Sequence, residues 1–162
     1  MASGKSTVGR CLAEKLGMSF LDTDEYIEKK QKRKISDIFF ESGEAFFRKL
    51  ENECARALNT EDNTVIATGG GFVLNPENIA LMKKNGIIVN LETNADVIAD
   101  RLAESRKTRP LMSSSSVGQI LEEFEKRKSF YDNCDIKIKL TLTGKTEDYV
   151  KEIMQKIKKL KG

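Results

Sequence analysis

The chain alternates short apolar runs with longer amphipathic segments. Apolar residues spaced three and four positions apart predict helices over residues 6–16, 24–30, 36–41, 43–58, 76–85, 95–104, 117–131 and 146–160. Short apolar runs predict strands over residues 19–21, 65–67, 87–91 and 136–142. Because strands and helices take turns along the chain, the pattern predicts βαβ units, right-handed crossovers and a mostly parallel sheet of the α/β class.

Two helix ends carry specific expectations. Gly17 is placed to end the first helix, since glycine tolerates the left-handed conformation that often follows a last turn. In the closing helix, Ile153, Ile157 and Leu160 form a stripe that predicts a core-facing side. The lysines of that helix are then expected to lie on a solvated face, although a basic run can also bind an anionic partner.

Composition removes several classes of function. The 162 residues fit one domain, and the net charge of +3 is too mild to predict nucleic-acid binding. Histidine is absent, which excludes catalytic triads and metal sites that need imidazole. Three widely spaced cysteines, Cys11, Cys54 and Cys134, indicate reduced thiols that are buried or half-buried. No apolar run reaches the roughly 20 residues of a membrane helix and no secretory leader is evident, so the expected compartment is the cytoplasm.

The first seven residues match the second half of a phosphate-binding P-loop. Glycine lets backbone amides approach phosphate closely, and a following helix directs its unpaired N–H groups and its dipole toward the anion. Lys5 would add a positive charge, and the Ser6 hydroxyl would suit Mg²⁺. A solvated turn is the plain alternative. The nucleotide-binding residues predicted here are Ala2, Ser3, Gly4, Lys5, Ser6 and Thr7.

Two further segments follow predicted strands, where ligands gather in open α/β sheets. Asp22 and Asp24 come after the first strand. Asp22 would suit a water-mediated magnesium contact, and Asp24 could accept the proton of a hydroxyl or a hydrogen bond from it. The glycines of residues 69–71 follow the next strand and leave backbone amides open to a small polar ligand. A polar turn and a flexible loop are the alternatives.

Three arginines, Arg48, Arg109 and Arg127, lie in distinctive local strings. A helical arginine is usually a solvated surface residue. Its planar fork nevertheless matches carboxylate and phosphate, so two converging arginines would bind a carboxylate substrate.

Read in order, these strings resemble the shikimate kinase family over essentially the whole chain. They are GKSTVGR with LA, FLDTD, ISDIF, GEAFFR, ATGGG, RPL and the RKSFY segment that begins at Arg127. The resemblance implies an ATP-dependent kinase that phosphorylates the 3-hydroxyl of shikimate on the route to chorismate and aromatic amino acids. A gluconate-kinase-like enzyme and a non-catalytic binding module stay open as alternatives.

The resemblance also implies roles for individual residues. Lys5 would hold the transferring phosphoryl group, while Ser6, with Asp22 behind it, would hold Mg²⁺. Asp24 would orient or deprotonate the attacking hydroxyl. The remaining implied contacts are Arg48 and Arg127 on the shikimate carboxylate, Gly69, Gly70 and Gly71 on its ring hydroxyls, Arg109 on the γ-phosphate and Lys145 on the adenine side.

For the fold, the resemblance implies a three-layer P-loop kinase sandwich with strand order 2-3-1-4-5. One domain would span residues 1–162, with substrate-binding helices near 24–58 and a lid near 105–118. The family's central first strand is missing, because the chain opens directly into a helix. We therefore expect that the natural chain begins upstream, and that a chain beginning at Met1 would be poorly stable and bind ATP weakly. A monomer that binds neither nucleic acid nor membrane is also expected.

Overall fold

The computed structural model describes residues 4–93 and 117–162. The chain divides into two compact units, Lys5–Ile88 and a second one that holds the chain from Val89 onward, and each is described separately. The expected helix at 95–104, the expected lid and Arg109 lie outside the described residues. The expectation of one domain over 1–162 stays a prediction.

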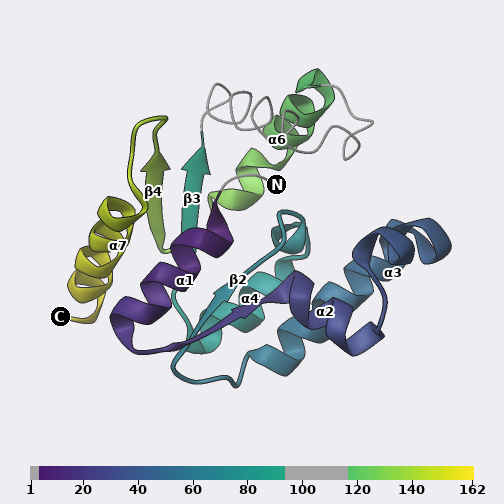
Figure 1. Cartoon of the computed structure of the whole chain (residues 1–162), viewed down its shortest axis with the longest axis horizontal. Coiled ribbons are helices and arrows are strands. Elements are labelled where there is room, and N and C mark those ends of the chain that lie inside the picture. The colour runs from purple at the N-terminus through teal and green to yellow at the C-terminus, as the bar shows by residue number, and fades with distance from the viewer. Residues whose placement is uncertain (1–3, 94–116) are drawn as a thin grey trace. The chain divides into compact units, whose positions relative to one another are not determined.

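The first unit contains two parallel strands and the helices around them (Figure 1). Its elements are α1 (Lys5–Leu16), β1 (Ser19–Asp22), α2 (Thr23–Gln31), α3 (Ile35–Leu58), β2 (Thr64–Ala67), the 3₁₀ turn η1 (Phe72–Leu74) and α4 (Pro76–Asn85). The register of β1 and β2 pairs Ser19 with Thr64 and Asp22 with Ala67. Both strands therefore end at the same edge, and α2 and the glycine segment 69–71 both start from it.

Helix α1 packs against both strands of this unit. Gly9 permits the close approach, because a Cβ there would lie 2.8 Å from the Phe20 ring. The helix ends as expected at Gly17, whose φ is 65°. The N–H of Met18 donates to the carbonyl of Ala13 and that of Gly17 to the carbonyl of Glu14, a Schellman end.

Helix α3 carries the apolar core of the first unit. It bends at Gly43, whose φ of 78° and ψ of 172° are not helical, so the two helices expected around this residue meet there. Beyond the bend, one face of α3 is buried against α2 and α4. The buried cluster comprises Ile27, Ile38, Phe47, Leu50, Cys54 and Leu58. Burial raises the pKa of the Cys54 thiol to about 12, as befits a core residue.

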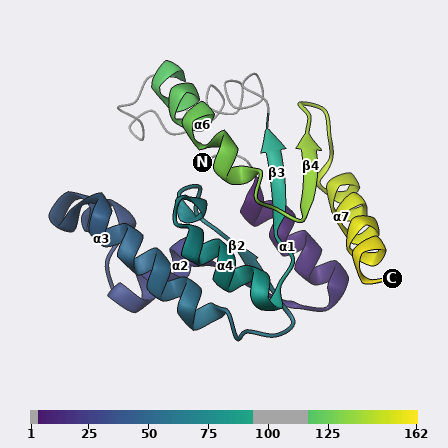
Figure 2. The same cartoon turned by 180° about the vertical axis from the view of Figure 1, so that it is seen from behind.

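The second unit contains a second parallel pair. Its described elements are β3 (Val89–Thr93), α6 (Val117–Tyr131), β4 (Ile136–Leu140) and α7 (Thr146–Lys161). Strand β4 alternates buried Ile136, Ile138 and Leu140 with exposed lysines, and α7 packs on it. Figure 2 shows α7 beside β4 and β3 on the other side of that strand. The α7 residues buried in this unit are Tyr149, Val150 and Ile153.

Several boundaries and burials differ from the expectations. The strand expected at 87–91 is Val89–Thr93, because its ladder starts where Val89 meets Ile136 of β4. Strand β2 is mostly half-buried rather than buried, since among the described strands it pairs along one edge alone. Leu160 is 55% exposed, so the apolar stripe of α7 was predicted one turn too long. The turn η1 was not predicted.

The strand pairs agree with the expected order. The expected order counts a first strand that is not among the predicted elements, so β1, β2, β3 and β4 correspond to its strands 2, 3, 4 and 5. The observed pairs β1–β2 and β3–β4 are then the expected neighbours 2-3 and 4-5, and both are parallel as expected. Among the described helices, none has the length and apolar character needed to cross a bilayer. All three cysteines are free, with Cys54 buried and the other two half-buried, which confirms the expectation for them.

Candidate active site

The carboxylate of Asp22 links the start of α1 to the start of α2. Its Oδ2 accepts a hydrogen bond of 2.7 Å from the Ser6 hydroxyl. Its Oδ1 accepts one of 3.0 Å from the backbone N–H of Asp24 and so caps α2. The two aspartates of the predicted pair, two residues apart, are thus linked where β1 passes into α2, and Ser6 and Asp22 are in contact. Their roles at a magnesium ion stay predictions.

Lys5 and Asp24 share an electrostatic environment in this unit. Burial lowers the pKa of Lys5, although Asp24 and Asp22 act in the opposite direction. Burial also raises the pKa of Asp24; Asp22 adds to this effect and Lys5 opposes it. A lysine and a carboxyl group with pKa values shifted from their usual ranges are the kind of pair that active sites use to move charge and protons.

One oxygen of Asp24 is directed at the glycine segment 69–71. Asp24 Oδ1 is buried and has no hydrogen-bond partner among the described residues. A Cβ on Gly69 would lie 2.8 Å from this oxygen. Because a buried carboxylate oxygen normally accepts a hydrogen bond, this position is suited to a hydroxyl of a bound ligand.

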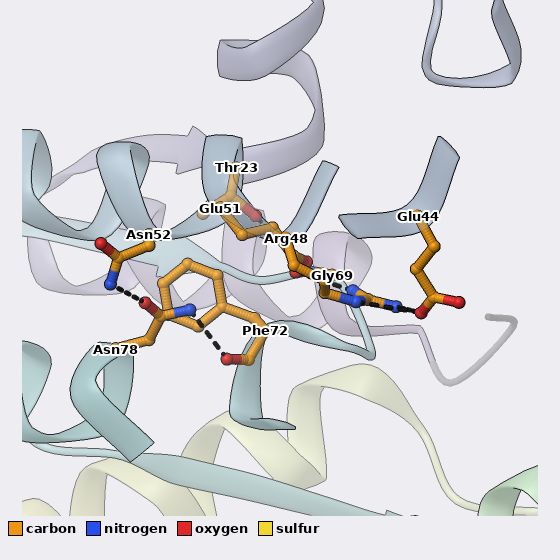
Figure 3. A network of polar contacts seen from close by, with 8 residues as sticks. All are labelled: Thr23, Glu44, Arg48, Glu51, Asn52, Gly69, Phe72 and Asn78. Carbon is orange, nitrogen blue, oxygen red and sulfur yellow. Dashed lines mark hydrogen bonds and ion pairs between the residues drawn. The ribbon is translucent and has the colours of Figure 1, made fainter. Parts of the chain in front are cut away.

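Arg48 lies over the other end of the glycine segment, at Gly71. Figure 3 shows the arginine with Glu44 and Glu51 of the same helix. A Cβ on Gly71 would lie 2.0 Å from Arg48 Nη1, so the guanidinium rests on bare backbone. Nη1 donates to Oε2 of Glu51 at 2.7 Å, and Nη2 and Nε donate to Oε1 of Glu44 at 2.6 and 3.1 Å. The arginine is therefore held between two carboxylates of its own helix.

The two carboxylates differ in burial. The Glu51 side chain is 1% exposed and the Glu44 side chain is 60% exposed, while that of Arg48 is 24% exposed. Burial alone would lower the pKa of Arg48, but its hydrogen bonds to Glu51 and Glu44 outweigh burial and raise it. Glu51 thus fixes the inner side of the guanidinium, and Glu44 occupies the side that a solvent-borne carboxylate would reach.

The glycine segment is anchored on both sides. The N–H of Gly69 donates to Oγ1 of the fully buried Thr23 at 3.2 Å. Beyond the segment, the carbonyl of Phe72 accepts from the buried Asn78 side chain at 3.0 Å. The amide of Gly69, predicted to bind a ligand, is therefore engaged within the protein in this structure.

The remaining predicted residues lie at the start of α1, in the second unit or outside the described residues. Gly4 precedes α1 with a φ of 75°, and Thr7 is exposed on the first turn of that helix. Arg127 lies half-buried on α6 and Lys145 caps α7, both in the second unit. Convergence of Arg127 with Arg48 therefore stays a prediction. Ala2, Ser3 and Arg109 lie outside the described residues.

Four residues around the glycine segment were not predicted from the sequence: Thr23, Glu44, Glu51 and Asn78. The sequence did contain a signal for Glu51. This residue shares a helical face with the apolar residues Phe47, Leu50, Cys54 and Leu58, and a carboxylate that is buried with them needs a charged or hydrogen-bonding partner. Thr23 and Asn78 gave no comparable signal, since only the fold brings them to the glycine segment.

The oxygens near Lys5 are compatible with a magnesium ion. The Ser6 hydroxyl and the Asp22 carboxylate are hard oxygen donors 2.7 Å apart. Mg²⁺ commonly keeps several waters and takes only one or two protein oxygens beside substrate phosphates. Within the described residues, no group of three or more acidic or cysteine side chains could form an all-protein metal site.

A lysine at a helix start, an aspartate pair at the adjoining strand end and an arginine over a glycine segment define a small-molecule kinase of the P-loop class. The family model for shikimate kinase matches residues 1–158. A shikimate kinase of Bacillus mycoides is 41% identical over 158 residues, covering 98% of this chain and 92% of that protein. One from a Sulfurihydrogenibium species is 42% identical over 159 residues, with coverage of 98% and 94%. The chain therefore belongs to the shikimate kinase family.

Solved structures agree with this assignment. Shikimate kinase from Acinetobacter baumannii in complex with shikimate matches with a TM-score of 0.87 and 33% identity, covering 99% of this chain and 90% of that one. The enzyme from Aquifex aeolicus matches with a TM-score of 0.82 and 39% identity, covering 98% and 92%. The expected α/β P-loop kinase fold is confirmed.

The unequal burial of the two carboxylates beside Arg48 predicts unequal effects on stability. We expect Glu51→Gln to lower the free energy of unfolding by about 1–3 kcal/mol, because it leaves a largely buried guanidinium without its inner charge partner. The matched change Glu44→Gln removes an exposed partner and should cost at most about 0.5 kcal/mol. Urea unfolding followed by circular dichroism measures both, and equal losses would contradict the assignment of Glu51 as the structural anchor.

Proposed function

We propose that this protein transfers the γ-phosphoryl group of ATP to the 3-hydroxyl of shikimate, giving 3-phosphoshikimate and ADP on the route to chorismate. The observation that carries the proposal is the glycine segment 69–71, against which Asp24 packs at one end and Arg48 at the other. This arrangement places a group that binds hydroxyls and a group that binds carboxylates at one small site. Membership of the shikimate kinase family supports the choice of substrate.

In this proposal Arg48 binds the shikimate carboxylate. The guanidinium stays attached to Glu51 and exchanges its contact with the exposed Glu44 for the incoming carboxylate. Arg127 supplies a second guanidinium, and the backbone of Gly69, Gly70 and Gly71 faces the ring hydroxyls. Gly69 contributes chiefly by holding the segment in place, since its amide is bonded to Thr23.

ATP binds with its phosphates at the amino end of α1. The N–H groups of the first turn lack helical acceptors and carry the positive end of the helix dipole. Ala2, Ser3, Gly4 and Thr7 surround the phosphates, and Lys5 neutralises the transferring group. Arg109 approaches the γ-phosphate, and Lys145 lies on the adenine side.

The Ser6 hydroxyl, with Asp22 behind it, would hold Mg²⁺. When bound, the ion would offset phosphate charge and help to orient the leaving group. Asp22 also fixes the backbone of Asp24 through the 3.0 Å cap, so the same carboxylate connects the metal side to the substrate side.

In the reaction, the oxygen of the 3-hydroxyl attacks the γ-phosphorus, and Asp24 accepts the proton of that hydroxyl. A new phosphate ester bond forms, the bond to the bridging oxygen breaks, and ADP leaves. Lys5 stabilises charge on the transferring group, so positioning and charge neutralisation supply most of the catalysis and no imidazole is needed.

The wider proposal is a cytoplasmic monomer whose ligands are ATP and shikimate and which uses neither nucleic acid nor membrane as a partner. Size-exclusion chromatography with light scattering measures the oligomeric state.

The direct test is ADP formation from ATP and Mg²⁺ with shikimate or gluconate as acceptor, with ³¹P NMR to locate the new phosphate. We expect turnover with shikimate and a 3-phosphate product. A preference for gluconate would replace the proposed substrate. Binding of both ligands by calorimetry without turnover would favour a non-catalytic module.

Asp24 is expected to govern the acid side of the pH profile. Because burial and Asp22 raise its pKa above the usual value of about 3.9, kcat/KM should fall as pH drops through this elevated value. Asp24→Asn should lower kcat about 10²–10⁴-fold. Calorimetric titration with ATP checks that the variant is folded, and wild-type-like kcat in this variant would exclude Asp24 as the base.

Gly71 tests whether Arg48 needs bare backbone beneath it. The φ of −93° at Gly71 suits alanine, so Gly71→Ala should act only by displacing the guanidinium. We expect the KM for shikimate to rise about tenfold, equivalent to about 1.4 kcal/mol, with the KM for ATP unchanged. Gly17→Ala is the control: it strains a left-handed residue that has nothing within 4 Å, so it should lower stability and leave both KM values alone.

Glu44 is expected to compete with the substrate carboxylate. Since Glu44→Gln weakens the contact that shikimate must replace, we expect the KM for shikimate to fall about 2–5-fold, the range of an exposed ion pair. Initial rates at low ionic strength measure it, because salt screens exposed pairs. A higher KM would mean that Glu44 instead holds Arg48 in its binding position.

A further inference from the structure

Asn78 is a fully buried polar side chain that the proposed reaction does not use. It lies in the first turn of α4, and its residue is 0% exposed. A buried amide is costly unless each of its polar ends has a partner. Its partners therefore indicate what it contributes.

Both ends of the Asn78 amide are engaged (Figure 3). Nδ2 donates to the carbonyl of Phe72 at 3.0 Å, and Oδ1 accepts from Nδ2 of Asn52 at 2.9 Å. Phe72 directly follows the glycine segment 69–71, whereas Asn52 belongs to α3, one residue after Glu51. The side chain thus joins the end of the glycine segment to the helix that carries Arg48.

The direction of these hydrogen bonds is determined by the groups at the two ends of the hydrogen-bonded series, Arg56 and the carbonyl of Phe72. Arg56 Nε, which can only donate, bonds to Oδ1 of Asn52 at 3.0 Å. The carbonyl of Phe72 can only accept. Asn52 and Asn78 between them must therefore each accept with oxygen and donate with nitrogen, so their amide orientations are unambiguous.

The glycine segment is short and is held at two points. Thr23 binds the N–H of Gly69 and Asn78 binds the carbonyl of Phe72. Between them, the N–H of Phe72 donates to Gly69 at 3.2 Å and the N–H of Leu74 to Gly71 at 3.0 Å. Release of the Asn78 contact would remove one restraint from the backbone next to Gly71, against which the Arg48 guanidinium lies.

We propose that Asn78 is a positioning residue that sets the position of Gly71 beneath Arg48 and thereby the affinity for the carboxylate substrate. The inference deepens the proposed function and rests on it. Asn78 touches no substrate; it acts through the carbonyl of Phe72 on the backbone that Arg48 lies against.

The test is Asn78→Asp, which keeps the shape and replaces the donor with an oxygen that faces the Phe72 carbonyl. The matched control is Asn85→Asp on the same helix, where Nδ2 donates to the carbonyl of Asn59 at 2.9 Å, in an exposed contact at the other end of α4. We expect Asn78→Asp to raise the KM for shikimate about 5–10-fold and to leave the KM for ATP within about twofold, by loss of positioning. Asn85→Asp should change neither value.

Hydrogen exchange provides a readout that is independent of turnover. The amides of Phe72 and Leu74 should exchange at least about tenfold faster in Asn78→Asp, because their hydrogen bonds close the turn that Asn78 holds. If the wild-type protein does not phosphorylate shikimate, the proposed function is wrong. Exchange at the two amides still tests Asn78 separately, because unchanged rates in Asn78→Asp would show that Asn78 does not hold the glycine segment.

A second variant covers the case in which a buried carboxylate prevents folding. Asn52 is half-buried, and Asn52→Leu removes the amide that donates to Asn78. This variant should raise the KM for shikimate about 2–4-fold and leave the KM for ATP unchanged. A lower melting temperature with an unchanged shikimate KM, in either folded variant, would mean that the network only stabilises the fold and would overturn the proposal.

Discussion

The ion pair between Arg48 and Glu51 determines how the candidate site is built. A carboxylate on the buried face of α3 requires a compensating charge, and the guanidinium three residues earlier supplies it. Once its inner edge is bonded to Glu51, the Arg48 guanidinium lies against Gly71, in the space that a Cβ would take. The glycine at that position follows from the lack of space for a Cβ, and the outer edge of the guanidinium is left for an exchangeable partner.

Asp22 has the corresponding role at the start of α1. One of its oxygens accepts from Ser6 at the start of α1 and the other from the backbone of Asp24 at the start of α2. The group proposed to hold the metal and the group proposed to meet the attacking hydroxyl are consequently coupled through a single carboxylate. Such coupling suits phosphoryl transfer, where the position of donor and acceptor matters more than the reactivity of any side chain.

A site without histidine must obtain its acid–base behaviour from environment. Here burial shifts the pKa of Lys5 downward and that of Asp24 upward, so the two groups lie closer in proton affinity than in water. The glycine segment contributes backbone and close approach, and Thr23 and Asn78 hold it in place from opposite sides. The polar network around the segment is therefore as much a part of the site as the charged residues that lie on it.

Local patterns in the sequence were sufficient for the elements and for much of the site. Apolar spacing and helix-ending residues predicted α1, α4 and α6, because helix formation and termination depend on neighbours a few residues away. Helix α3 was predicted as two helices, 36–41 and 43–58, which the structure joins across the bend at Gly43. Motifs pointed to Lys5 and Ser6 at a helix start, to Asp22 and Asp24 at a strand end and to Arg48 within a distinctive helical string, and the roles of these residues stay predictions. Only the tertiary structure decided that Asp24 and Arg48 pack on the same three glycines, that Glu51 anchors the arginine, and that Thr23 and Asn78 clamp the segment between them. The contacts of the glycine segment with Asp24, Arg48 and Thr23 join residues 23 to 46 positions apart, and the pairing of Arg48 with Glu51 depends on burial. Neither long-range contact nor burial is encoded in a short window of sequence.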